Sequence, residues 1–256
     1  MDAIQLSTNT RIYWFLIRKS ISEFNRGYFF SVLWTLALPL LQGFVLIAIF
    51  SSVYKESLAD VMTYIWPGLF LWNYFVKSTN SIGFSLDGSV IKLTTVPNIL
   101  FPASKLFDDF FPLLFSFIII FGFTLSRNLF NSWLFLGNFF LLLPAILAIT
   151  LGIGLIIATL FVFFRDIQHM WTITCQIGLF ISPIFIKSSF LVNSKYWFAL
   201  KFNPFFYLML IAREPLISGS LSPIEYWQIV YISSFSVLFI GIVIFQKLNR
   251  YFIHFC

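Results

Sequence analysis

The chain has 256 residues, of which 59% are apolar and only 10% are charged, and its mean hydropathy of +0.91 lies outside the range of soluble globular proteins. A net charge of +6 could indicate nucleic-acid binding, but the sixteen basic residues are scattered along the chain rather than gathered on a single polar face. The two cysteines and two histidines are solitary, so their spacing predicts neither a metal site nor a disulfide framework. The composition therefore predicts a polytopic membrane protein.

The first predicted element is an amphipathic helix over residues 11–26. At 100° per residue, its aromatic and aliphatic side chains fall mainly on one side and its basic side chains on the other. This pattern is typical of a helix that lies in the membrane interface near anionic headgroups, and a generic positively charged anchor explains it equally well. The apolar run that follows is too long for a cleavable signal, so we expect it to remain as the first span.

Six apolar runs follow, each about as long as a bilayer requires. They cover residues 32–54, 61–80, 107–125, 133–164, 167–186 and 227–246. An even number of spans places both termini on one side, and that side receives ten Lys and Arg residues against six on the other. The sequence therefore predicts a single-domain, all-α membrane protein with six transmembrane helices and cytoplasmic termini.

Two of the connecting segments are long enough to hold structure of their own. The cytoplasmic segment 81–106 has glycines and prolines around a short amphipathic stretch at residues 90–93. The external segment 187–226 contains an apolar piece that is too short to span, which favours a re-entrant or interfacial helix. We expect Pro204 to start that helix and Pro215 to stop it.

The fourth apolar run contains 32 residues without one charge, with Pro144 as the expected bend, and it ends abruptly at Arg165 and Asp166. Sequence neighbours on a helix point about 100° apart, so these two side chains cannot pair with each other. An Arg at the end of one helix and an Asp at the start of the next both meet favourable helix dipoles. The pair predicts a tight turn at a membrane face, either a functional joint or an ordinary polar stop.

The charged residues indicate what this chain does not do by itself. All ten carboxylates are expected in loops or at span edges, whereas ion-coupled carriers hold ionisable groups inside the bundle. The sequence has no G-x-x-x-x-G-K-[S/T] motif, so it has no P-loop for a nucleotide. Gly152 and Gly154 are expected to serve helix packing. We therefore expect no cofactor in this chain and an external source of energy for transport.

Aromatic residues make up 21% of the chain, including 36 Phe. Sugars present apolar C–H faces that stack on aromatic rings, so an aromatic-lined passage would suit a glycan. For any single Phe, contact with lipid is the simpler explanation. The tryptophans are expected to form interface belts, and these are Trp66, Trp72, Trp171, Trp197 and Trp227.

Short motifs along nearly the whole chain resemble the permease subunit of ABC transporters that export polysaccharide. The resemblance is strongest to the O-antigen branch, beside the teichoic-acid and capsule branches. The motifs are Arg26, Trp34 and Pro39; residues 68–75; Phe101 and Pro102; residues 164–167; residues 182–184; and Asn203 with Pro204. The most specific motif is the Phe-Arg-Asp sequence at residues 164–166. Residues 97–100 differ from the family pattern, in which a more regular basic stretch is expected before Phe101.

The resemblance implies a homodimer in the inner membrane, in which each subunit has an interface helix and six spans. Two cytoplasmic ATP-binding-cassette subunits would bind and hydrolyse ATP. The polysaccharide, most closely an O-antigen, would pass between the two permease subunits while its undecaprenyl-diphosphate anchor stays among the membrane lipids. Export of teichoic acid or capsular polysaccharide by the same mechanism remains open, and nucleic acid is not an expected partner.

The resemblance also implies roles for particular residues. The residues expected to meet the ATPase are Val90, Ile91, Lys92, Leu93, Arg165 and Asp166. The basic residues expected at the lipid diphosphate are Arg18, Lys19 and Arg26, because the planar fork of arginine suits phosphate oxygens. The residues expected at an external gate are Asn203, Pro204 and Arg213.

Two other classes of function compete with transport. An intramembrane lipid-linked glycosyl or acyl transferase needs clustered His, Asp or Glu at one membrane face, and the only candidates are Asp108, Asp109 and Asp166. The positive end of the helix dipole at the start of the third span explains Asp108 and Asp109 equally well. A structural or assembly factor would show no change in export when Arg165 is altered.

Overall fold

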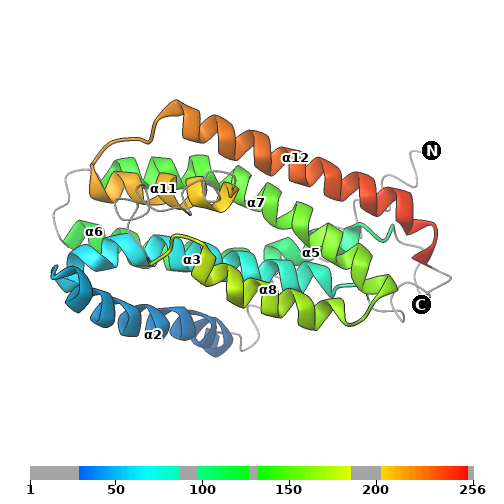
Figure 1. Ribbon diagram of the computed structural model, residues 1–256, viewed down its shortest axis with the longest axis horizontal. Coiled ribbons are helices and arrows are strands. Elements are labelled where there is room, and N and C mark those ends of the chain that lie inside the picture. The colour runs from blue at the N-terminus through cyan, green and yellow to red at the C-terminus, as the bar shows by residue number, and fades with distance from the viewer. Residues whose placement is uncertain (1–28, 87–96, 127–131, 186–202, 253–256) are drawn as a thin grey trace.

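The computed structural model describes residues 29–86, 97–126, 132–185 and 203–252 (Figure 1). The predicted interface helix at 11–26 and the loop residues 90–93 lie outside these ranges, as do Arg18, Lys19 and Arg26. Every regular element in the described residues is an α-helix. The predicted all-α class is therefore confirmed for this part of the chain.

Eight described helices lie largely along one common direction (Figure 1). In chain order they are α2 (Phe29–Tyr54), α3 (Leu58–Gly83), α5 (Leu100–Asp108), α6 (Phe110–Ser126), α7 (Ser132–Phe163), α8 (Ile167–Ile181), α11 (Pro204–Ile217) and α12 (Ile224–Asn249). The turn between α7 and α8 lies at the same end of the bundle as the C-terminal end of α12, and the turn between α2 and α3 lies at the opposite end (Figure 1).

Helix α7 is the centre of the bundle and packs most extensively against α12 and α3. A Cβ atom added to Gly152 would lie only 2.7 Å from the backbone of Leu238 on α12, and one added to Gly241 would collide with the carbonyl oxygen of Gly152. A Cβ atom on Gly154 would lie 2.5 Å from Ile82 on α3. Gly152 and Gly241 therefore let the backbones of α7 and α12 approach closely, and Gly154 leaves room for the Ile82 side chain of α3, which confirms the predicted packing role.

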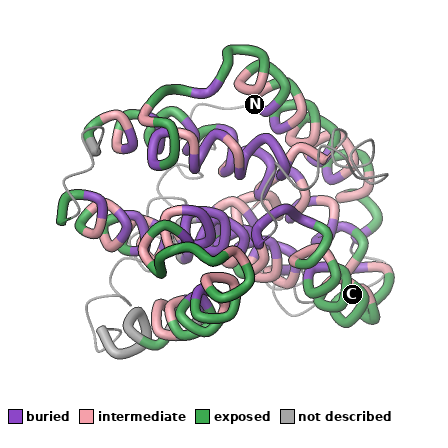
Figure 2. The backbone as a smooth tube through the Cα atoms, turned by 60° about the vertical axis from the view of Figure 1, so that its left-hand side comes forward, coloured by how far each residue is buried: buried purple, intermediate pink, exposed green. Residues whose placement is uncertain are grey.

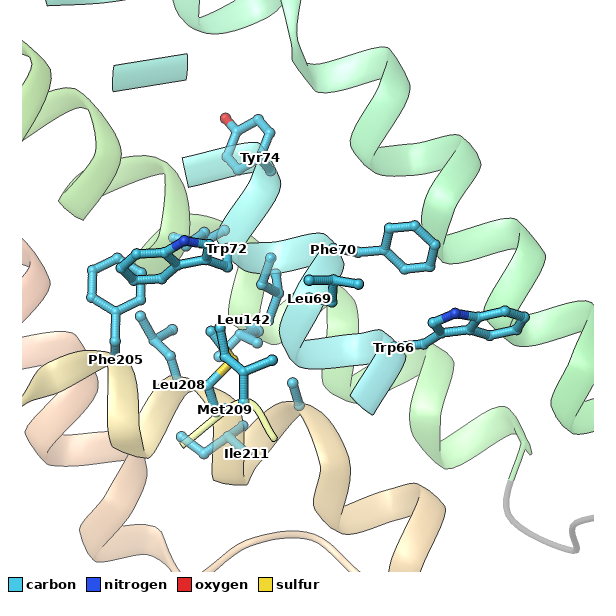
Figure 3. Packing of buried hydrophobic residues seen from close by; sticks show 14 of the residues in the cluster. Trp66, Leu69, Phe70, Trp72, Tyr74, Leu142, Phe205, Leu208, Met209 and Ile211 are labelled. Atoms are coloured by element: carbon cyan, nitrogen blue, oxygen red, sulfur yellow. The ribbon is translucent and has the colours of Figure 1, made fainter. Parts of the chain in front are cut away.

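Helix α3 lies between the other helices, and 16 of its 26 residues are buried. Ser57 caps its first turn, because its hydroxyl accepts a hydrogen bond of 3.2 Å from the backbone N–H of Asp60. Figure 3 shows side chains of α3 packed against residues of α7 and α11. Figure 2 shows that buried residues line the inside of the bundle, whereas α2, α8 and α12 carry long exposed stretches.

The prediction that the tryptophans form interface belts is wrong for Trp66 and Trp72. These side chains are 5% and 7% exposed, because α3 is surrounded by helices that cover them. Trp66 makes an edge contact with Phe123 at 5.9 Å between ring centres, and Trp72 makes one with Phe205 at 5.3 Å. Trp171 and Trp227 are half-buried, and Trp197 lies outside the described residues.

Three helical stretches in the described residues have the length and hydropathy of a membrane span: Leu100–Ser126, Trp133–Phe163 and Ile224–Asn249. Helices α2, α3 and α8 occupy the positions of the other three predicted spans. Helix α3 is more polar than the other long helices, and its neighbours bury Ser78 and Thr79, whereas Lys77 stays 47% exposed. The total of six spans stays a prediction.

The third apolar run differs from the prediction at its start. The helix begins at Leu100, inside the predicted loop 81–106, and is interrupted at Asp109 between α5 and α6. Helix α3 also extends to Gly83, so the segment that links the two helices is shorter at both ends than predicted. The motif residues Phe101 and Pro102 lie in the first turn of α5.

Helix α8 ends at Ile181, earlier than the predicted end at residue 186. Ser182 is extended, with φ −69° and ψ 139°, because the following Pro183 disfavours a helical conformation in the residue before it. At 1.5 Å per residue a helix of 15 residues is about 22 Å long, which is less than the ~30 Å hydrocarbon core.

Helix α11 starts where the sequence predicts and ends later. Asn203 caps it, since its side-chain oxygen accepts a hydrogen bond of 2.9 Å from the N–H of Phe205. Pro215 does not stop the helix, which continues to Ile217. Proline has no N–H for the carbonyl of Ile211, and the amide of Asn138 on α7 donates a hydrogen bond of 2.9 Å to that carbonyl instead. The prediction at Pro215 is wrong because a remote residue replaces the missing donor.

Candidate functional site

Arg165 and Asp166 form a tight turn between α7 and α8, as the sequence predicts. The N–H of Ile167 donates to the carbonyl of Phe164 at 3.2 Å, and the N–H of Gln168 donates to the carbonyl of Arg165 at 3.2 Å. Both turn side chains are exposed, and the Asp166 carboxylate makes no capping hydrogen bond to α8. The turn therefore presents one cation and one anion at an end of the bundle, where a partner protein can contact them.

A small hydrophobic cluster lies directly beneath this turn. Its buried members come from the C-terminal parts of α7 and α12 and from the residues that follow α3 and α12, and they are Leu86, Leu155, Ala158, Val162, Phe245 and Phe252. Ile99 and Phe101, which follow the undescribed residues 87–96, pack against it, and Asn98 donates a hydrogen bond of 2.6 Å to the side chain of Asn249. Both flanks of the predicted coupling loop therefore contact the same core as the helix that ends at the turn.

Sequence reasoning missed an ion pair between α3 and the break before α6. The ammonium of Lys77 lies 2.8 Å from Oδ1 of Asp109, and the hydroxyl of Ser81 donates to Oδ2 of Asp109 at 3.0 Å. Ser78 lies 3.4 Å from the same oxygen. Asp109 does lie at the N-terminal end of α6, where the dipole argument placed it, but it is only 3% exposed and pairs with another helix. A single Lys within an apolar run was the available signal, since such a group needs a counter-ion.

At the opposite end of α3, Arg213 of α11 joins three of the predicted motifs. Its Nη1 donates to the carbonyl of Pro183 at 2.8 Å and its Nη2 donates to the carbonyl of Ile184 at 2.9 Å. The guanidinium also lies 4.0 Å from the centre of the Tyr64 ring. A Cβ atom on Gly68 would lie 2.5 Å from Nη2, so only glycine leaves room for the guanidinium there.

Arg213 is 1% exposed, so it faces the interior of the protein rather than an open passage. Burial lowers the pKa of its guanidinium from the ordinary value, and the phenol groups of Tyr64 and Tyr54 act in the opposite direction. Arginine remains charged in proteins, so the chain keeps a buried cation that carbonyl oxygens and an aromatic face stabilise. Of the predicted gate residues, Asn203 and Pro204 start α11 and Arg213 fixes it to α3.

An aromatic cleft of about 330 Å³ lies between α3, α8 and α11. Its rings belong to Trp72, Phe75, Trp171 and Phe205, and its polar groups include Thr174 and Asn203. The indole N–H of Trp171 donates to the hydroxyl of Thr79 at 3.1 Å, which fixes the half-buried ring at the wall of the cleft. The sequence indicated that aromatic side chains would matter, but it did not indicate which ones come together.

The described residues do not assemble the groups that a transferase requires. They contain no set of three or more His, Cys, Asp and Glu that could hold a metal ion. The carboxylate of Asp109 already accepts from a lysine and a serine. Asp166 is exposed in the turn, and the side chain of Asp108 lies outside what the structure describes.

Long apolar helices around a tightly packed helical core define an integral membrane protein. The chain is similar to an O-antigen export system permease protein RfbA of Klebsiella pneumoniae, with 29% identity over 231 residues, which are 87% of this chain and 86% of the relative. A second Klebsiella pneumoniae protein of the same name is 27% identical over 228 residues, 86% of this chain and 85% of the relative. The protein of that name from Myxococcus xanthus is 23% identical over 175 residues, 66% of this chain and 65% of the relative.

No protein-family model matches the chain. The similarity to two permeases over most of their length confirms the resemblance to the O-antigen branch of polysaccharide-export permeases.

Proposed function

We propose that this chain is the transmembrane subunit of an ABC exporter that carries an undecaprenyl-diphosphate-linked O-antigen polysaccharide across the inner membrane. The similarity to O-antigen export permeases over 87% of the chain carries this proposal. The chain itself forms the passage for the polysaccharide. A separate subunit, present in two copies, binds and hydrolyses ATP. Both termini lie in the cytoplasm.

The exposed turn at Arg165 and Asp166 is the proposed contact with the ATP-binding subunit, together with loop residues Val90, Ile91, Lys92 and Leu93. The geometry of the turn supports this role, because it offers two opposite charges on a fixed backbone. The small cluster beneath the turn also supports it, since Leu86 and Phe101 flank the loop and contact the core that contains Val162 of α7. A displacement of the loop would therefore be transmitted to α7 through these buried side chains.

A second copy of the chain is proposed to face α8, so that the polysaccharide passes between the copies. Gln168, Thr172 and Gln176 are exposed and four residues apart, so they share one face of the helix. Polar side chains are costly to expose to lipid, and a homodimer would remove them from it. In the same structure, the exposed face of α12 is apolar and contains Ile232, Phe239 and Ile240, which suits contact with lipid.

The aromatic cleft beside α8 is the proposed contact with sugar rings. Its aromatic walls and amide and hydroxyl groups match a ligand that has apolar C–H faces and many hydroxyls. At the external end, Asn203, Pro204 and Arg213 are proposed to position α11 as part of a gate. The basic residues Arg18, Lys19 and Arg26 are proposed to approach the lipid diphosphate from the cytoplasmic interface.

The proposal is tested by reconstituting the chain with its ATP-binding subunit in liposomes that contain a lipid-linked O-antigen. ATP is expected to move the glycan to the opposite leaflet, where an added glycosidase no longer reaches it. A matched sample contains a partner subunit whose P-loop lysine is replaced by alanine. Equal movement of the glycan in both samples, or no movement in either, would contradict the proposal.

A further inference from the structure

A second cleft, of about 300 Å³, lies on the side of α3 that faces α2 and α6. It is separate from the aromatic cleft, and the two share no lining residue. Its walls are mostly apolar and include Trp34 and Pro39 of α2, Phe70 of α3 and Leu113 of α6. The polar groups that line it include Tyr74, Lys77 and Asp109. An apolar cleft with an ionic group matches a molecule that has an apolar chain and a charged head.

Tyr74 is the observation that points to a ligand. Its side chain is 5% exposed and lines the cleft, and its hydroxyl interacts with the side chain of Ser78 but makes no hydrogen bond of good geometry among the described residues. A buried hydroxyl that lacks a well-formed hydrogen bond costs free energy, and such groups are rare in folded proteins. Figure 3 shows the hydroxyl of Tyr74 directed away from the core residues Leu142, Leu208 and Met209. An acceptor oxygen in the cleft would satisfy it.

Lys77 supplies the charge for the same acceptor. Its side chain is 47% exposed, in contrast to the 4% of its partner Asp109. The carboxylate of Asp109 accepts from Lys77 through Oδ1 and from Ser81 through Oδ2, so its own charge is compensated. An ammonium has three N–H donors and binds phosphate oxygens as a point charge. Asp109 therefore positions Lys77 in the cleft and balances its charge when no ligand is present.

We propose that this cleft binds the phosphate-bearing head of a membrane lipid, with Tyr74 and Lys77 donating hydrogen bonds to phosphate oxygens. The hydrocarbon chain would lie against the apolar walls formed by Trp34, Phe70 and Leu113. The diphosphate carrier of the exported polysaccharide and an ordinary anionic phospholipid share this chemistry. Only the choice of the carrier as ligand rests on the proposed function.

The test uses two photoreactive lipids and the full-length chain in phosphatidylcholine vesicles. One probe is a farnesyl diphosphate with a diazirine in its chain, and the other is a phosphatidylglycerol with a diazirine in one acyl chain. Labelled residues are mapped by mass spectrometry. Labels are expected on the parts of α2 and α6 that line the cleft, at Pro39 and Leu113 among others.

Two variants test the donors. Tyr74→Phe removes one oxygen and keeps the ring, so folding is preserved, and it is expected to raise the half-saturating probe concentration about threefold. The double variant Lys77→Met with Asp109→Asn leaves no unpaired buried charge and is expected to raise that concentration at least about tenfold. Lys105→Met is the matched control, because Lys105 is an exposed lysine on α5 that does not line the cleft.

Labelling of the cleft by the diphosphate probe alone supports the carrier as the ligand, and equal labelling by both probes supports a resident phospholipid. The proposal is overturned if neither probe labels the cleft, or if both donor variants are labelled like the unmodified chain. The assay needs neither ATP nor the partner subunit. A chain that is labelled but does not export glycan would contradict the proposed function and leave this site intact.

Discussion

The guanidinium carbon of Arg213 lies 4.0 Å from the centre of the Tyr64 ring, while its terminal nitrogens donate to the carbonyls of Pro183 and Ile184. A single buried side chain thus connects α11 to α3 and to the backbone that follows α8. A buried cation of this kind is costly unless it is hydrogen-bonded, so these contacts should be sensitive to substitution.

We expect Arg213→Lys to lower the free energy of unfolding by about 2 to 3 kcal/mol, because an ammonium cannot bind both carbonyls as a planar fork and also stack on Tyr64. Thermal unfolding in detergent, followed by circular dichroism, measures the change. Arg250→Lys is the matched control, since Arg250 also lies over a ring, that of Tyr251, but is exposed. An equal effect of the two substitutions would show that the buried carbonyl contacts add nothing.

We expect Gly152→Ala to destabilise the protein by about 1 to 3 kcal/mol, because the new methyl group would meet the backbone of Leu238 on α12. Gly137→Ala on the same helix is the control. A Cβ atom there has no neighbour within 4 Å, so this substitution should stabilise α7 by about 0.5 to 1 kcal/mol through helix propensity. Unfolding curves of both variants that coincide with the original would contradict close packing of α7 on α12.

We expect Arg165→Ala to leave the chain inserted in the membrane and bound to its ATP-binding subunit, and to uncouple ATP hydrolysis from export. The side chain is exposed, so its loss should change stability by no more than about 0.5 kcal/mol. Surface glycan in cells and ATP hydrolysis in membranes are the two measurements. Unchanged surface glycan would remove this turn from the mechanism.

We expect a cysteine at position 176 to cross-link two copies of the chain. The variant Gln176→Cys is made after Cys175 and Cys256 are replaced by alanine, and it is oxidised in native membranes. Phe239→Cys on α12 is the control, because Phe239 is also exposed but lies on the face assigned to lipid. Cross-linking at position 239 and none at position 176 would place the dimer contact on α12.

We expect the purified chain to hydrolyse no ATP in the absence of its partner, since its sequence contains no P-loop. Phosphate release is measured on the chain alone and on the chain with the ATP-binding subunit. Turnover by the chain alone that survives further purification would contradict the division of labour between the two subunits.

Local sequence patterns were sufficient to predict α7, α12 and the turn between α7 and α8. A charge-free run of 32 residues cannot be a strand, and adjacent opposite charges mark where it stops. The predicted starts of α8 and α11 also agree with the structure, because Ile167 follows a polar turn and Asn203 with Pro204 forms a capping pair. These features depend only on neighbouring residues.

Contacts between remote segments could not be predicted in this way. Asp109 was interpreted either as a candidate catalytic carboxylate or through the dipole of its own helix, yet its partner Lys77 lies on α3. Pro215 was expected to end α11, and Asn138 on α7 supplies the donor that lets the helix continue. Tryptophan is the residue type typical of an interface belt, but Trp66 and Trp72 are buried because other helices surround them. Each of these outcomes depends on tertiary packing that a single sequence does not display.

Near the start of α7, the side-chain amide of Asn138 donates a hydrogen bond to the Ile211 carbonyl of α11. Helix α7 then continues without interruption to Phe163. At 1.5 Å per residue, about 37 Å separate Asn138 from the end of α7 at Phe163, which precedes the Arg165 turn. Under the proposed function, α7 connects the contact with the ATP-binding subunit to the external gate. A tilt of α7 would then move both ends together, so ATP hydrolysis in the cytoplasm would open the gate on the other side of the membrane.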